Sequence, residues 1–207
     1  MNPPGHINFG ISVSPFNPHS NPFFVPTEAI ASCPELHRVQ EGYKTSEKPY
    51  HGTFAIAVSV SQKKILSILD ELLKLLNAKI SLNVLYEDQD HGLCTALNSE
   101  HNPWEATILR SIVMRYDQCL LHHGHISFCF QSNQNIRILF LPCKSFEIVV
   151  CSLQQQRSFI RLLRQRDLEY IPNLKPLDRL SHSRRATMKA QKEFNKLSQD
   201  LYLQPYT

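Results

Sequence analysis

Hydrophobic and small residues alternate strictly between Thr53 and Ser61. The larger side chains on one face are Phe54, Ile56, Val58 and Val60, and those on the other are Ala55, Ala57, Ser59 and Ser61. A period of two with β-branched and aromatic residues is typical of a half-buried strand. The small second face allows another part of the chain to pack closely over it.

Apolar residues then recur at helical spacing from Gln62 to Asn77, which predicts a helix with a wide apolar stripe. Ser61 is its expected N-cap and Asn77 its expected C-terminal stop. Alternation returns from Lys79 to Tyr86 and predicts a second strand. If the two strands are parallel in one sheet, their connection is right-handed and the helix covers one face of the sheet.

Further elements follow in the second half of the chain. Residues 103–119 have a helical pattern, with Asn102 as the expected N-cap and Pro103 at the first helical position. Residues 125–131, 136–141 and 146–151 alternate or are nearly all apolar, and polar turns separate them. Such close spacing predicts an antiparallel meander of three strands.

Two helices are expected after the meander. Ser152, followed three residues later by Gln155, matches a capping box, and the helix that it opens must end before Pro172. A last helix is expected near residues 184–201. It has few apolar residues, and we therefore expect it to dock loosely.

The first 50 residues hold 8 of the 13 prolines and contain no convincing helical pattern. Proline removes a hydrogen-bond donor and interrupts any ladder of strands. We expect an extended arm, with a short strand at Ile7–Val13, that lies partly against the body of the protein. The alternative is a tail that binds a partner.

These elements predict an α+β fold, a two-layer sandwich with a mixed, mostly antiparallel sheet of about five strands and helices on one face. The expected order is β-α-β-α-β-β-β-α followed by a C-terminal helix. The domains are a Pro-rich extended arm over residues 1–50, an α+β domain over 51–175 and a basic helical C-terminal extension over 176–207.

The net charge of +4 is unevenly distributed. Residues 157–196 hold 11 Lys and Arg against 4 Asp and Glu, a net charge of +7, and the rest of the chain has 11 against 14, a net charge of −3. No apolar run is long enough to span a membrane and no secretory signal precedes the first strand, so we expect a cytoplasmic protein. None of the six cysteines forms a CxxC pair, and reduced thiols are the simplest interpretation.

One possible chemistry is metal binding by histidines in two loops. His122, His123 and His125 follow Cys119 closely, and His91, Cys94 and His101 lie in the preceding loop. Imidazole and thiolate are the usual ligands of zinc, but this spacing fits no standard zinc pattern. Chance clustering of ten histidines is the competing explanation.

A second possible site is the acidic loop with Glu87, Asp88 and Asp90 directly after a strand. Carboxylates in such a position can hold Mg²⁺ or act as acid and base, although a solvated loop is the far more common explanation. With His91, this loop is the place to look for a metal-dependent hydrolase.

A third possible site is the basic C-terminal region, where Arg184, Arg185, Lys189 and Lys192, together with Lys196, could bind phosphate groups. A solvated helix face is the competing explanation. The chain has no GxGxxG, GxxxxGK[ST], GxSxG or HExxH motif, so no cofactor and no catalytic residue is identified. The expected function is therefore a non-catalytic binding or interaction module with a protein partner. Nucleic-acid binding through the basic C-terminal helices is the first alternative, and a metal-dependent hydrolase is the second.

Overall fold

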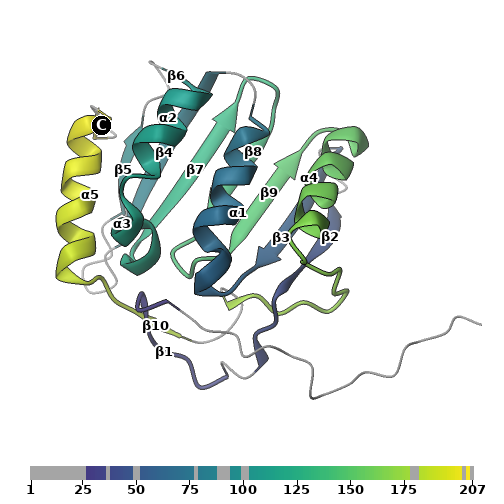
Figure 1. Ribbon diagram of the computed structural model, residues 1–207, viewed down its shortest axis with the longest axis horizontal. Helices are drawn as coiled ribbons and strands as arrows, with labels where there is room; N and C mark the ends of the chain where they lie inside the picture. The colour runs from purple at the N-terminus through teal and green to yellow at the C-terminus, as the bar shows by residue number, and fades with distance from the viewer. Residues whose placement is uncertain are drawn as a thin grey trace, which may run out of the picture.

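The computed structural model describes residues 27–35, 38–48, 52–76, 79–87, 94–98, 103–177, 182–201 and 204–205. A twisted sheet forms one layer, and helices α1 to α4 cover one of its faces (Figure 1). The helices are α1 Gln62–Lys74, α2 Ala106–Val113, α3 Asp117–His122, α4 Leu153–Gln165 and α5 Met188–Asp200. The predicted fold class, a two-layer α+β sandwich, is confirmed.

The main sheet has the strand order β11-β5-β4-β7-β8-β9-β3-β2, and β6 pairs with β4 beside this path. Its strands are β2 Gly42–Lys48, β3 Thr53–Ser59, β4 Lys79–Glu87, β5 Cys94–Asn98, β6 Trp104–Glu105, β7 Ile126–Ser132, β8 Arg137–Phe140, β9 Phe146–Val150 and β11 Gln204–Pro205. A separate two-stranded sheet pairs β1 Ile30–Ser32 with β10 Ser183–Arg184. The described residues therefore form more strands than the about five that the sequence predicted.

Neighbouring strands are antiparallel in all pairs of named strands that the structure describes, so the expected mixed sheet was wrong in this detail. β3 and β4 nevertheless point the same way, because β9, β8 and β7 lie between them. Helix α1 connects these two strands across the whole meander. The meander β7-β8-β9 thus completes the same sheet, as the sequence predicted.

The core lies between this sheet and its helices. The apolar stripe of α1, with Ile68 and Leu69 fully buried, packs against inward-facing residues such as Val58 and Phe128. Burying an aliphatic side chain of this size contributes about 2 kcal/mol. The predicted role of this helix, sealing one face of the sheet, is confirmed.

Strand β2 lies in the stretch that was expected to be an extended arm. It pairs with β3 from Gly42↔Ser59 to Lys48↔Thr53 and forms one edge of the main sheet. Its alternation is weak because its residues are mostly polar, and only pairing with a neighbouring strand makes it recognisable. The strand expected at Ile7–Val13 lies outside the described residues.

The single helix expected over residues 103–119 is two helices, α2 and α3. Trp104 and Glu105 form β6 and pair with β4, so α2 begins at Ala106 instead of Pro103. The chain leaves helical geometry at Tyr116, where φ is −108° and ψ is 52°. The predicted N-cap, Asn102, lies outside the described residues.

The start of α4 follows the predicted capping box in part. The Gln155 backbone N–H donates to the Ser152 hydroxyl at 3.2 Å, as expected. The Gln155 side-chain oxygen accepts from the Cys151 backbone N–H, also at 3.2 Å, and not from Ser152. The return hydrogen bond is therefore displaced by one residue.

Helix α5 packs more closely than expected. Phe194, Leu197 and Leu201 belong to the main core, and the Thr187 hydroxyl caps the helix by accepting from the Ala190 N–H at 3.2 Å. Figure 1 places α5 beside α3 at one end of the helical layer, opposite α4. None of the described helices has both the length and the apolar character needed to cross a membrane.

Candidate functional site

The three histidines predicted as metal ligands lie at the end of α3 and the start of β7. His122 and His123 are buried, and the rings of His123 and His125 have centroids 6.1 Å apart. Asp88, Asp90 and His91, the other predicted ligands, lie outside the described residues, as does His101. The described part of the chain contains no group of three or more His, Cys, Asp or Glu side chains placed to hold a metal ion.

His123 is held by packing and by one hydrogen bond. Its Nε2 lies 3.0 Å from the Gln191 Oε1, and its ring makes edge contacts with Tyr86 and Phe194. Burial, with a smaller contribution from the nearby Lys144 charge, lowers the pKa of His123 to about 4. The neutral ring therefore helps to join β7, β4 and α5.

Lys144 lies in the turn between β8 and β9, where a lysine is unusual because the position is buried. Its side chain is only 3% exposed, and its φ of 66° is one that lysine rarely adopts. Its Nζ donates to the His123 carbonyl at 2.7 Å and lies 5.1 Å from the centre of the Phe140 ring. Burial lowers the pKa of Lys144 to about 8. The amine anchors the turn to the histidine segment and is closed to an external ligand.

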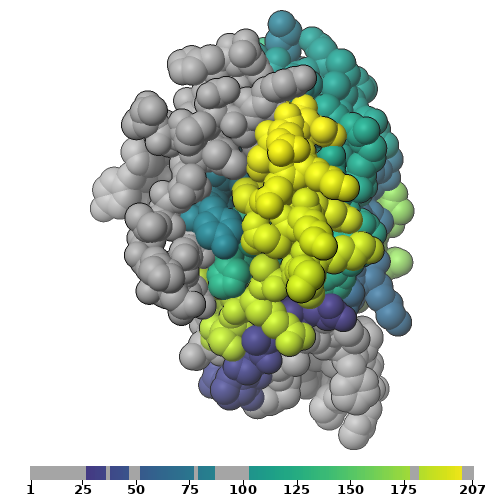
Figure 2. Space-filling view, turned by 90° about the vertical axis from the view of Figure 1, so that its left-hand side faces the viewer, coloured from purple at the N-terminus to yellow at the C-terminus, as the bar shows by residue number. Residues whose placement is uncertain are grey.

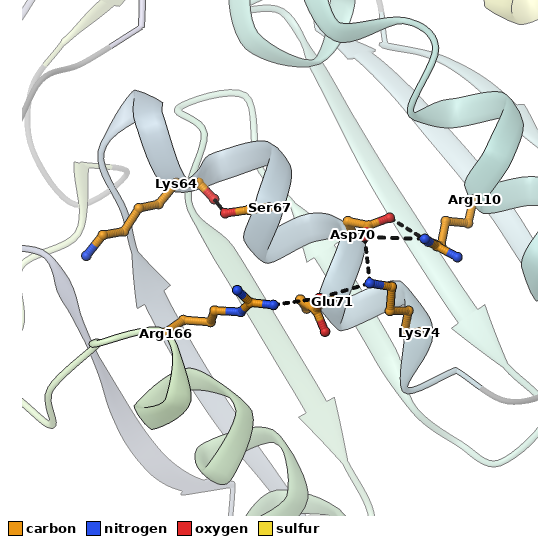
Figure 3. A network of polar contacts seen from close by, with 7 residues as sticks. All are labelled: Lys64, Ser67, Asp70, Glu71, Lys74, Arg110 and Arg166. Carbon is orange, nitrogen blue, oxygen red and sulfur yellow. Dashed lines mark hydrogen bonds and ion pairs between the residues drawn. The ribbon is translucent and has the colours of Figure 1, made fainter.

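A polar network joins the helices on the covered face (Figure 3). Asp70 of α1 accepts from Arg110 of α2 and pairs with Lys74 at 2.9 Å, while Glu71 accepts from Arg166 at 2.6 Å. Burial opposes ionisation of Asp70, but hydrogen bonds from Arg110 and Lys74 outweigh it and lower the pKa of that carboxyl. Because these charges compensate one another, we interpret the network as a connection of α1 to α2 and to the end of α4.

A hollow of about 280 Å³ adjoins this network. It is lined by Leu73, Lys74, Leu76, Glu105, Ala106, Thr107 and Arg110. Its two cations are already paired with Asp70, which leaves little net charge to attract an ion. This hollow therefore offers no charged site for a ligand.

Helix α5 carries the basic residues that the sequence singled out. Ala190, Phe194 and Leu197 are buried on one face, and Lys189, Lys192 and Lys196 are exposed on the other. At about 1.5 Å per residue, the three lysines cover about 10 Å of the helix axis. We call these three residues the lysine face, and Figure 2 shows α5 lying along the surface of the molecule.

The two acidic residues of α5 accept hydrogen bonds from the α3 region. The Glu193 Oε2 accepts from the backbone N–H groups of Gln118 and Cys119 at 3.0 and 3.1 Å. The Asp200 carboxylate accepts from the Tyr116 hydroxyl. Both carboxylates are therefore engaged with the α3 region, and the three ammonium groups have no ion pair with any described residue.

The two predicted arginines lie beside the start of this helix, in and after β10. Arg185 is exposed and donates from its Nε to the Glu28 carbonyl at 2.8 Å. Arg184 is half-buried in β10. Of the predicted nucleic-acid contacts, the structure thus brings Lys189 and Lys192 onto one exposed face with Lys196, and keeps Arg184 and Arg185 in the adjoining segment.

The helical pattern of α4 also places a second group of cations on one face, to which the sequence assigned no site. Arg157, Arg161 and Arg164 share one side of α4, which contains no acidic residue. Their spacing of four and three residues within an acid-free helix is the sequence signal for this group.

Comparisons of the chain with protein-family models, with curated proteins and with solved structures found no match.

Proposed function

We propose that this protein is a non-catalytic binding protein that holds the phosphate backbone of a nucleic acid on the lysine face of α5. The observation that carries the proposal is the division of charge on this helix. Lys189, Lys192 and Lys196 point outward, while Glu193 and Asp200 are engaged with the α3 region. A helix with a net charge of only +1 thereby presents three cations to solvent.

The kind of cation favours a polyanion over a protein as the occupant of this face. Lysine is depleted in protein–protein interfaces, where aromatic residues, methionine and arginine are enriched. The exposed large apolar residue on α5 is Met188, at the beginning of the helix. Phosphate binding needs no apolar anchor, because it gains free energy from the release of counterions.

The spacing of the lysines also suits a phosphate backbone. They span about 10 Å, which corresponds to about three steps of a DNA strand at about 3.4 Å of axial rise per step. Contacts to phosphates position a protein on nucleic acid without reading its sequence. We therefore expect binding that depends strongly on salt and weakly on base sequence.

The test is fluorescence anisotropy with a labelled 20-base-pair duplex across a series of NaCl concentrations. The variant K189A/K192A/K196A should bind more weakly at low salt, and its plot of log K against log salt should be shallower by about 0.9 per lost phosphate contact. The matched control is K63A/K79A/K175A, which removes the same charge from exposed lysines on other elements.

The two triple variants have the same net charge, so any difference between them comes from the position of the lysines. If both variants lose affinity equally, the protein attracts DNA only through its overall charge, and the lysine face is not a site. If the wild-type protein does not bind the duplex at low salt, the proposal fails outright.

A further inference from the structure

Arginine and aliphatic side chains form one stripe along the outer side of α4. The stripe consists of Leu153, Arg157, Ile160, Arg161 and Arg164, and we call it the arginine face. Each member is one, three or four residues from the next, so all five fall within about 100° of the helix circumference. Leu153 is 50% exposed, and Phe159 and Leu163 point to the opposite side, into the core.

The charges of the arginine face lack compensation within the described part of the chain. Arg157 and Arg161 make no hydrogen bond or ion pair with any described residue. Arg164 donates from its Nε to the Tyr43 hydroxyl at 3.0 Å, which holds its side chain in place. Three cations thus lie within about 10 Å of helix axis with no carboxylate between them.

A shallow hollow of about 460 Å³ lies along this face. It is lined by Arg157, Ile160, Arg161, Arg164 and Gln165. Its apolar part comes from Ile160 and from the hydrocarbon stems of the arginines, which can cover apolar surface while the guanidinium groups remain in solvent.

We infer that the arginine face is a docking surface for an acidic, amphipathic segment of a partner protein, with carboxylates and aliphatic residues at helical spacing. Arginine matches a carboxylate with two parallel hydrogen bonds and is enriched in protein interfaces, unlike the lysines of α5. The aliphatic residues supply the apolar contact that a phosphate backbone cannot use. This inference does not depend on the function proposed for α5.

The two surfaces are far apart in the fold. Figure 1 shows α4 and α5 at opposite ends of the helical layer, with α1 and α2 between them. A protein segment on α4 therefore leaves the lysine face of α5 free.

The experiment measures the affinity of fluorescein-labelled peptides for the full-length protein by anisotropy. The probe is a helical 16-residue peptide with Glu and Leu at alternating three- and four-residue spacing. A Glu/Ser peptide of the same charge and a Lys/Leu peptide of opposite charge are compared with it. The Glu/Leu peptide should bind at least tenfold more tightly than either.

Variants then locate the site. R157A/R161A should weaken binding of the Glu/Leu peptide at least tenfold, whereas R115A/R137A, which removes two exposed arginines elsewhere, should leave it within about twofold. The charge reversal R157E/R161E should gain affinity for the Lys/Leu peptide. All four arginines are exposed, so circular dichroism should show folded variants.

Three results would overturn the inference. Equal binding of the Glu/Leu and Glu/Ser peptides would show that apolar contact plays no part. Insensitivity to R157A/R161A would place the peptide elsewhere. The third result is that the 20-base-pair duplex displaces the peptide and binds more weakly to R157A/R161A. The arginine face would then be a phosphate site. If the duplex in addition bound K189A/K192A/K196A as tightly as the wild-type protein, the function proposed for α5 would also be refuted.

Discussion

The Glu193 carboxylate of α5 caps helix α3 by accepting from the backbone N–H of Cys119 at 3.1 Å. The same oxygen accepts from the Gln118 N–H at 3.0 Å, so one side chain satisfies two donors in the first turn of α3. An anionic group at a helix N-terminus is also favoured by the helix dipole. This contact connects α5 to the body of the protein through one of its two carboxylates.

We expect Glu193→Ala to lower the free energy of unfolding by about 2 kcal/mol, because Cys119 is buried and its N–H loses its partner. Glu193→Gln keeps the acceptor and should cost about half as much. Urea unfolding followed by circular dichroism measures both, with Glu169→Ala, a change at an exposed residue, as the control. Equal stability of Glu193→Ala and the control would show that the cap contributes nothing.

The second prediction concerns acid stability and His123. Its pKa is about 4 in the folded protein against an ordinary value of 6.5, because burial opposes its charged form. The unfolded chain therefore binds a proton at higher pH than the folded chain does. Protonation of His123 should therefore leave the free energy of unfolding unchanged above pH 6.5. As the pH drops from 6.5 towards 4, it should lower that free energy by about 3 kcal/mol in total.

Groups that face this ring, and carboxylates elsewhere in the fold, also affect how the free energy of unfolding depends on pH. Lys144 and His125 both disfavour its positive charge, and Gln191 accepts or donates at its Nε2. Glu41, Asp70 and Glu71 have lowered pKa values and also lose stabilising charge in acid. Their effect is common to the wild-type protein and to any His123 variant.

The measurement is therefore a difference between two proteins. Urea unfolding at pH 7, 6 and 5, followed by the fluorescence of the single tryptophan, should show a steeper loss of stability in the wild-type protein than in His123→Gln. The glutamine variant has lower stability at pH 7 but lacks the titrating ring. Parallel pH profiles would refute the assignment to His123.

The third prediction concerns the close approach of three segments at Gly124. A Cβ at this position would lie 2.6 Å from the Ala29 carbonyl oxygen and 2.8 Å from the Arg185 carbonyl oxygen. Both are backbone atoms, so the segments around β1 and β10 would have to move apart. We expect Gly124→Ala to cost about 3 kcal/mol, near the upper end of the usual range for overpacking.

Gly52→Ala is a suitable comparison, because its Cβ would meet no atom within 4 Å, although its φ of 59° is unfavourable for alanine. We expect a cost of about 1 kcal/mol there. Hydrogen exchange gives a local test: the Arg185 N–H, which donates to the Ala29 carbonyl at 2.8 Å, should exchange faster in Gly124→Ala. Unchanged exchange at Arg185 would contradict the steric argument.

The sequence predicted the lysine face only in part. Lys189, Lys192 and Lys196 were identified as basic residues of a helix, and helical spacing alone places them on one side. The sequence did not show that Glu193 and Asp200 form hydrogen bonds with the α3 region. Their partners, Gln118 and Tyr116, are 75 and 84 residues away along the chain. Charge compensation is a property of contacts in space and has no local signal.

Local periodicity was sufficient to identify the strand at Thr53, the helix at Gln62 and the meander from Ile126, because alternating and helical patterns follow from the geometry of each element. It could not place β3 beside β9, reveal the polar edge strand β2 or divide α2 from α3. Those features arise from pairing and packing between distant segments, where the free energy gained by burial and hydrogen bonding outweighs local preference. The sequence thus determined the strands and helices that have a strong apolar period, because that period follows from local geometry. The tertiary structure decided the polar and short strands, the neighbours of every element and which charged side chains lack a partner in the described part of the chain.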